Sequence, residues 1–220
     1  MDVSQLIALF RAEAKDQKKP YLWQDVELIT YAGEAEYEAA RRTRCLFDFS
    51  TPAICAVAVT ANQPLYKLDP RVLFVRRLKL SLQPHILPKC DQRDLDTLYW
   101  GWEEMPASYP CTWFAPNFRH IRLVPAPNLD QVMNLQVVRL PLDRLTGLGD
   151  EPEIDERWHD GLVHWMLYRA YGKQDSQSND PQKAATALAQ YENVFGKISN
   201  ARDEVWLAEK HGMDEYEGGY

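Results

Sequence analysis

Histidines, aspartates and glutamates, the side chains from which a catalytic or metal site could be built, are concentrated in the stretch ERWHDGLVHWMLYRAYGKQD, at positions 156–175. A metal-dependent phosphohydrolase of the HD type needs histidines and aspartates that converge on one ion, and the sequence could offer His120, His159, Asp160 and Asp175. The spacing argues against such a site. His159 and His164 are five residues apart, about 140° around a helix, whereas joint chelation requires an i, i+4 pair. We expect these residues on a helix surface, beside a core face of Trp and Tyr.

Other catalytic patterns are missing from the sequence, which contains no GxSxG, GxxxxGK[ST], HExxH or GxGxxG string. The acidic run DEPEIDE has no partner cluster for acid/base catalysis, and helix capping and the helix dipole explain Asp155 and Glu156. The four cysteines include no CxxC pair, which favours free thiols over a zinc or dithiol site. We therefore predict a protein with no catalytic residues, no metal and no cofactor. A metal-dependent hydrolase centred on His159 and Asp160 is kept as an alternative.

Two basic runs are the other candidates for a functional surface. In RVLFVRRLK, at positions 71–79, Arg76 and Arg77 should lie on opposite faces of a strand, so that only alternate charges line one surface. The net charge of −7 argues against a surface that grips phosphate throughout. Solvated faces or charge pairs with a neighbouring subunit are favoured, and a nucleic-acid-binding accessory module is kept as a second alternative. The other run, RRTR, contains Arg41, Arg42 and Arg44.

The composition predicts a folded protein with a substantial core. Of 220 residues, 45% are hydrophobic and 11% aromatic, which is enough apolar surface to offset the entropy of ordering the chain. Trp100, Trp102 and Trp113 are typical of core or interface anchors. The first residues lack the basic region and cleavage site of a signal peptide, and no window approaches roughly 18 apolar residues. We expect a soluble cytosolic protein with no membrane segment.

The predicted secondary structure changes in type twice along the chain. Helical periodicity in residues 2–17 and 23–47 is followed by alternating, proline-punctuated strand patterns from about residue 51 to 143. Helical sequence then returns. A later helix should bury the face that contains Trp158, Leu162, Trp165 and Arg169. The second helix should approach its neighbours closely through small residues, on a stripe formed by Val26, Ile29, Gly33, Tyr37 and Ala40 with Ala32, Ala35 and Ala39 beside it. The last helix should begin at Asp180-Pro181, an N-cap followed by proline at the first helical position.

These patterns predict an α+β fold in which a helical bundle is built from both chain ends and carries an inserted β-rich domain, because neither terminal pair of helices has enough area for a core of its own. The predicted parts are residues 1–50 and 146–205 for the two halves of the bundle, 51–145 for the β-rich domain, and 206–220 for an extended C-terminal tail.

Three stretches resemble the head-to-tail adaptor proteins of tailed bacteriophages, also called head completion or connector proteins. LITYAGEAEYEAARRTRCLFD is similar to the family's long second helix, and IRLVPAPNLDQVMNLQVVRLPL to its closing β-hairpin. ERWHDGLVHWMLYRAYGKQDSQSNDPQKAATALAQYENVFG is similar to its C-terminal helical hairpin. Gly33 replaces an Asn that is common in the family, and His159 and His164 are not family signatures.

The resemblance implies a structural virion protein made in the host cytoplasm and placed at the neck, between head and tail. Its partners would be the portal protein, a tail tube or nozzle protein and further copies of itself, expected as a dodecameric ring that extends the DNA channel without binding DNA specifically. An acidic protein suits a channel through which DNA slides. The expected portal contacts are Trp206, Tyr216 and Tyr220 in the tail, and the expected subunit or lumen surface is formed by Arg41, Arg42 and Arg44.

Overall fold

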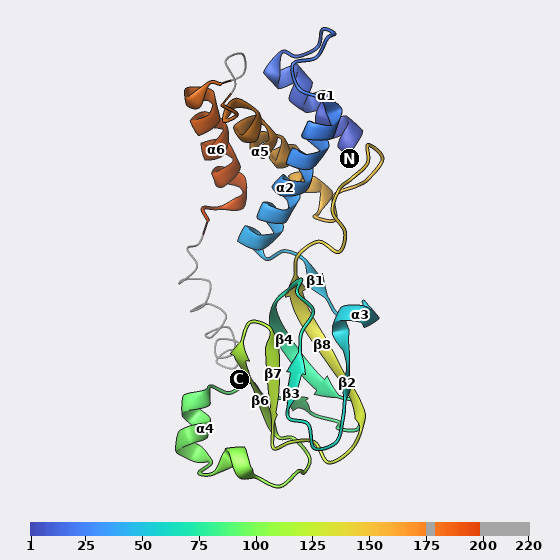
Figure 1. Ribbon diagram of the computed structural model, residues 1–220, viewed down its shortest axis with the longest axis vertical. Coiled ribbons are helices and arrows are strands. Elements are labelled where there is room, and N and C mark those ends of the chain that lie inside the picture. Colours follow the sequence, from blue (N-terminus) through green and yellow to red (C-terminus); the bar gives the residue numbers. More distant parts are fainter. Residues whose placement is uncertain (175–178, 199–220) are drawn as a thin grey trace. The chain divides into compact units, whose positions relative to one another are not determined.

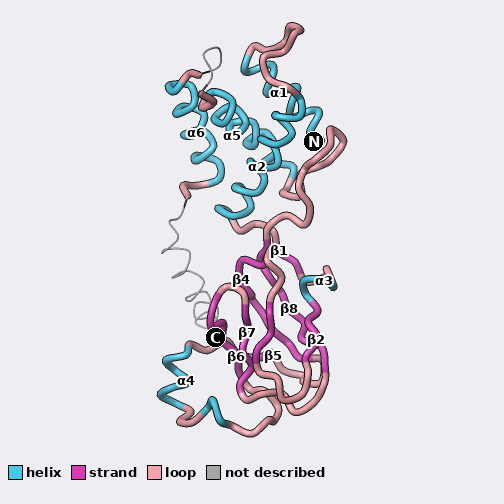
Figure 2. The backbone as a smooth tube through the Cα atoms, in the orientation of Figure 1, coloured by secondary structure: helices cyan, strands magenta, loops and turns pink. Residues whose placement is uncertain are grey.

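The computed structural model describes residues 1–174 and 179–198, and it confirms the predicted α+β class (Figure 1). The chain divides into two compact units. We call residues 1–46 with 140–198 the helical unit and residues 47–139 the β unit, and Figure 2 shows that the strands are confined to the second. No helix in the described ranges is long and apolar enough to cross a membrane.

The helical unit consists of α1 (Val3–Ala14), α2 (Asp25–Thr43), the short 3-10 helix η2 (Glu156–Trp158), α5 (His159–Tyr171) and α6 (Pro181–Phe195). Local sequence fixes two of the helix starts. Asp2 and Gln5 form a reciprocal capping box at α1. At α6, the Asp180 carboxylate accepts from the backbone N–H of Lys183, and Pro181 occupies the first turn, as predicted.

α5 is the central helix of this unit, because it contacts α1, α2 and α6. It therefore buries more than the predicted single stripe. Leu162, Met166 and Ala170 are fully buried, whereas Arg169, which was placed on the buried face, is exposed. A Cβ on Gly161 would lie 2.8 Å from Cε2 of Phe195, so the small residue allows the close approach of α5 and α6.

The buried stripe of α2 also differs from the prediction. Val26 is 77% exposed, whereas the predicted Ala40 and its neighbours Ala32, Ala35 and Ala39 are buried. The core also receives Leu28, Tyr31 and Glu36. The stripe is rotated because α1 and α5 cover that side of the helix. The helix ends at Thr43, where Arg44 adopts a left-handed conformation, and not at Phe47 as predicted.

The β unit contains a five-stranded antiparallel sheet, sheet A. Its strands are β1 (Phe47–Asp48), β2 (Ala56–Val59), β4 (Val72–Leu80), β5 (Ile86–Leu87) and β8 (Gln131–Arg139). The order is β1-β8-β4-β5, and β2 also pairs with β8. The predicted strand over STPAICAVAV is interrupted at its start, because Pro52 begins the short helix α3 (Pro52–Cys55).

A second antiparallel sheet, sheet B, has the order β3-β7-β6, from β3 (Leu65–Lys67), β6 (Thr112–Asn117) and β7 (His120–Val124). The predicted helical segment before it forms α4 (Gln92–Leu98) and the 3-10 helix η1 (Trp102–Glu104). Leu95 of α4 and Trp102 of η1 pack with Phe114 and Val124 of sheet B in one apolar cluster. The α4–η1 segment therefore covers one face of sheet B.

Candidate interaction site

The two residues of the His-Asp dipeptide lie in different environments. His159 is 3% exposed, and its Nε2 lies 2.9 Å from the carbonyl oxygen of Ile154. Because a carbonyl oxygen only accepts, Nε2 carries a proton and donates it. Asp160 is exposed. The predicted helix-surface position of His159 is therefore wrong, since its imidazole is buried and holds the loop that leads into α5.

The other residues of the hypothetical metal site do not join His159. His120 lies in β7 of the β unit, with its Nδ1 2.9 Å from Oδ1 of Asn117. His164 is half-buried in α5, and Asp175 lies outside the described residues. Among residues 1–174 and 179–198, no group of three His, Cys, Asp or Glu is placed to hold a metal ion. The hydrolase alternative is not favoured by this arrangement.

Arg42, one of the predicted surface cations, is enclosed in the helical unit. Its side chain is 4% exposed, and its guanidinium carbon lies 5.3 Å from the ring centre of Trp165 and 5.0 Å from that of Tyr191. Nη1 donates to the carbonyl oxygen of Gly196 at 3.1 Å. The stacked cation therefore ties the end of α2 to α5 and α6.

The two neighbouring arginines are more accessible. Arg41 pairs with Glu38 at 3.0 Å, and its side chain is 29% exposed. Arg44 is half-buried at the end of α2. A role for Arg41, Arg42 and Arg44 at a subunit or lumen surface stays a prediction. The predicted portal contacts, Trp206, Tyr216 and Tyr220, lie outside the described residues.

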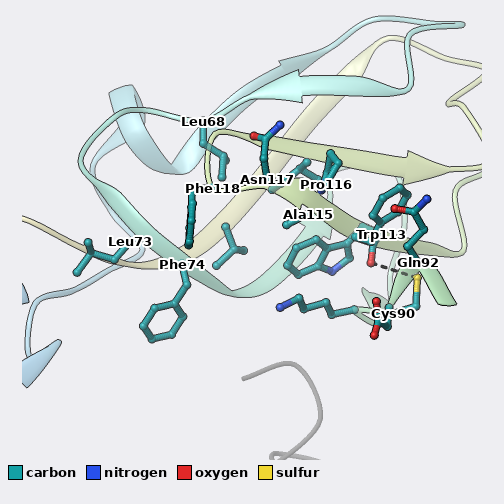
Figure 3. Close-up of a pocket in the computed structure, with 15 residues that line it drawn as sticks. Leu68, Leu73, Phe74, Cys90, Gln92, Trp113, Ala115, Pro116, Asn117 and Phe118 are labelled. Carbon is teal, nitrogen blue, oxygen red and sulfur yellow. Dashed lines mark hydrogen bonds between the residues drawn. The ribbon is translucent and has the colours of Figure 1, made fainter. Parts of the chain in front are cut away.

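A cavity of about 350 Å³ opens in the β unit between β4, β6 and β7 (Figure 3). Its apolar walls include Leu68, Phe74 and Phe118, and its floor is formed in part by Trp113. Trp113 is buried, and its Nε1 donates to the carbonyl oxygen of Leu87 at 3.1 Å. A buried hydrogen bond thus holds the indole in the cavity wall.

The polar groups of this cavity do not form a reactive set. The thiol of Cys90 donates to the carbonyl oxygen of Trp113 at 3.4 Å. Burial raises the pKa of this thiol, so the poorly nucleophilic thiol dominates near neutral pH. The ammonium of Lys89 lies 5.9 Å from the centre of the Trp113 ring. Most of the residues that line the cavity are apolar, and no local pattern of the sequence predicts it, because its walls come from separate strands.

The three tryptophans singled out in the sequence have different environments. Trp102 and Trp113 are buried, at 5% and 2% exposed, so they are core residues. Trp100 is 97% exposed, and the adjacent Tyr99 is 44% exposed. A fully exposed tryptophan is typical of an anchor for a binding partner, because it contributes a large apolar area to an interface.

A buried carboxyl group is also present in the helical unit. Glu36 of α2 is 2% exposed and accepts a hydrogen bond from the backbone N–H of Glu153. Burial raises the pKa of Glu36 to about 7. Glu36 therefore fixes the loop after β8 through a buried hydrogen bond to its backbone.

Comparison with known proteins gives one family. The family model described as SU10 adaptor protein matches residues 1–210. No curated protein matches the chain.

Proposed function

The chain belongs to the SU10 adaptor protein family, and from that premise we propose that it is the head-to-tail adaptor of a tailed bacteriophage, a structural virion protein and not an enzyme. The extent of the family match carries this proposal, because residues 1–210 include the described parts of both units. The buried His159, whose Nε2 donates to a backbone carbonyl, the exposed Asp160 and the raised pKa of the Cys90 thiol agree with a structural role.

In this proposal many copies form a ring, expected to be a dodecamer, between the portal protein and the tail tube or nozzle protein. The ring extends the channel through which the genome passes. A net charge of −7 supports a passive channel, because tight binding to DNA depends on cations that replace the counterions of the phosphates. The protein would then be found in the neck of the virion, after synthesis in the host cytoplasm.

The two units take separate parts in this proposal. One core cluster contains buried residues of α1, α2, α5 and α6, which supports a helical bundle assembled from both chain ends, with the β-rich domain inserted between the halves. The C-terminal tail would contact the portal through Trp206, Tyr216 and Tyr220, since aromatic residues on a polar background are typical of a segment that becomes ordered on a partner.

Electron microscopy of portal-containing heads, purified without the protein and then mixed with it, tests this function. We expect a ring of density below the portal. A variant that lacks residues 206–220 should keep the far-UV circular dichroism of the full chain and should not bind the heads. Heads that acquire no ring from the full-length protein would refute the adaptor assignment, and normal binding of the truncated variant would refute the tail contact alone.

A further inference from the structure

One face of sheet A is open to solvent over part of its length, up to Gln136 of β8; Val138, the next residue on that side, is buried. Along β8 the burial alternates, so that Met133, Leu135 and Val137 are buried while Val132, Asn134 and Gln136 are exposed. On the neighbouring strand β4, Val75 pairs with the buried Val137. Val75 also lines the cavity shared with β6 and β7 of sheet B. The buried face of sheet A therefore points toward sheet B, and the face that contains Val132, Asn134 and Gln136 points away from it.

A bulge in β4 concentrates positive charge on this open face. Val75 pairs with Val137 and Arg77 pairs with the adjacent Gln136, so Arg76 is an extra residue in the ladder. Both arginines are exposed, and Lys79, paired with Asn134, is exposed as well. The alternation predicted for Arg76 and Arg77 is therefore wrong, because the bulge shifts the side-chain register by one residue.

Apolar side chains lie among these cations. The guanidinium carbon of Arg76 is 5.0 Å from the ring centre of Phe47, which is 59% exposed on β1. Val132 and Ile86 are each more than 40% exposed on strands of the same sheet. The strand residues described for this face include no carboxylate, although the whole chain carries a net charge of −7. We call this surface, formed by Phe47, Arg76, Arg77, Lys79 and Val132, the basic face.

The opposite side of the β unit carries the complementary charge. The α4–η1 segment, residues 91–104, contains five carboxylates and one cation, and it covers the face of sheet B that points away from sheet A. It is held there by Trp102, whose Nε1 donates to Oδ1 of Asp96 at 2.8 Å and whose ring lies 4.7 Å from the guanidinium carbon of Arg122. Glu103, Glu104 and Trp100 are exposed on this segment.

We propose that the α4–η1 segment of one copy docks on the basic face of the next copy. This inference rests on the proposed function and identifies the contact between subunits of the ring. Because the two surfaces lie on opposite sides of one unit, their contact is heterologous, the type that closes into rings when the rotation allows it. Glu103 and Glu104 would approach Arg77 and Lys79, and opposite charges would select the register of the contact.

Trp100 gives this contact an apolar anchor. The indole would lie against Phe47 and Val132, where an arginine guanidinium such as that of Arg76 can stack on its face. DNA phosphate would also be attracted to the basic face. The acidic segment is the better match, because Phe47 and Val132 offer an apolar surface. Trp100 can pack against this surface, whereas a phosphate group cannot.

Paired charge reversals in the full-length protein test this contact, with ring formation on portal-containing heads scored by electron microscopy. Arg77→Glu/Lys79→Glu and Glu103→Lys/Glu104→Lys should each reduce ring occupancy at least about tenfold, and the chain that carries all four changes should recover it, since opposite charges again face each other. Lys67→Glu/Arg119→Glu is the control, because it makes the same change of charge on exposed residues of sheet B and its β6–β7 turn.

A photo-crosslinking residue at position 100 provides a second measurement on the same particles. We expect cross-links to β4 or β8 of another copy. If both charge-reversal variants form rings at the wild-type occupancy, or if position 100 cross-links to portal protein or DNA, this inference is overturned. The adaptor function would still stand. If wild-type protein forms no ring on the heads, the adaptor function fails and the contact fails with it. Unchanged thermal unfolding of each variant excludes loss of folding as the cause.

Discussion

Glu36 should make the stability of the helical unit fall as the pH rises through neutrality. The residue is 2% exposed, and burial raises the pKa of its carboxyl group to about 7 from an ordinary value of 4.5. A group with a raised pKa in the folded state contributes stability that is fully present below its unfolded pKa and is lost as the pH rises through its folded pKa. The window is therefore about pH 4.5 to 7.

The size of the effect follows from the difference between the two pKa values. A difference of roughly 2.5 pH units corresponds to roughly 3 kcal/mol, at about 1.4 kcal/mol per unit. Glu36→Gln resembles the protonated acid, since its amide oxygen can still accept from the backbone N–H of Glu153, and it does not ionise. The variant should be about 1 kcal/mol more stable than the wild-type protein at pH 5 and roughly 3 kcal/mol more stable at pH 8.

Urea unfolding followed by circular dichroism at helical wavelengths, at several pH values from 5 to 8, measures this difference. Glu13→Gln is the matched control, because Glu13 is an exposed carboxylate on α1 of the same unit. We expect the control to follow the wild-type pH dependence. Parallel curves for wild-type protein and Glu36→Gln across this range would refute the assignment of a buried, protonated Glu36.

Three further changes probe packing and buried polar groups. Gly161→Ala should lower the free energy of unfolding by about 1–3 kcal/mol in thermal unfolding, because its Cβ would meet Phe195 at 2.8 Å; Gly149→Ala, with open space around it, is the control. Arg139→Met should cost about 3 kcal/mol in urea unfolding of the β unit, because it removes the cation 2.6 Å from the buried Asp48 carboxylate, and a neutral result would contradict this pairing. Tyr191→Phe should cost about 1 kcal/mol, because the hydroxyl donates to the carbonyl oxygen of Ala35 at 2.7 Å; Tyr109→Phe, at an exposed position, should cost nothing measurable.

Features that depend on a few adjacent residues could be predicted from the sequence. The start of α6 at Asp180-Pro181 and the small residues that α2 turns toward its neighbours follow from capping and from side-chain size. The family resemblance was likewise carried by short stretches of sequence, and the match over residues 1–210 confirms the family. These signals are local, so they do not require knowledge of what packs against each element.

Burial and register could not be predicted, because they depend on residues that are distant in the chain. His159 was expected on a surface, but the carbonyl group of Ile154 and the surrounding core enclose it. Trp100 and Trp102 are two residues apart, yet only Trp102 has sheet B beneath it. The α+β class and the family could be read from local sequence patterns. The position of Arg76, Arg77 and Lys79 on one face could not, because it depends on the bulge at Arg76, and a strand's register is set by its partner strand.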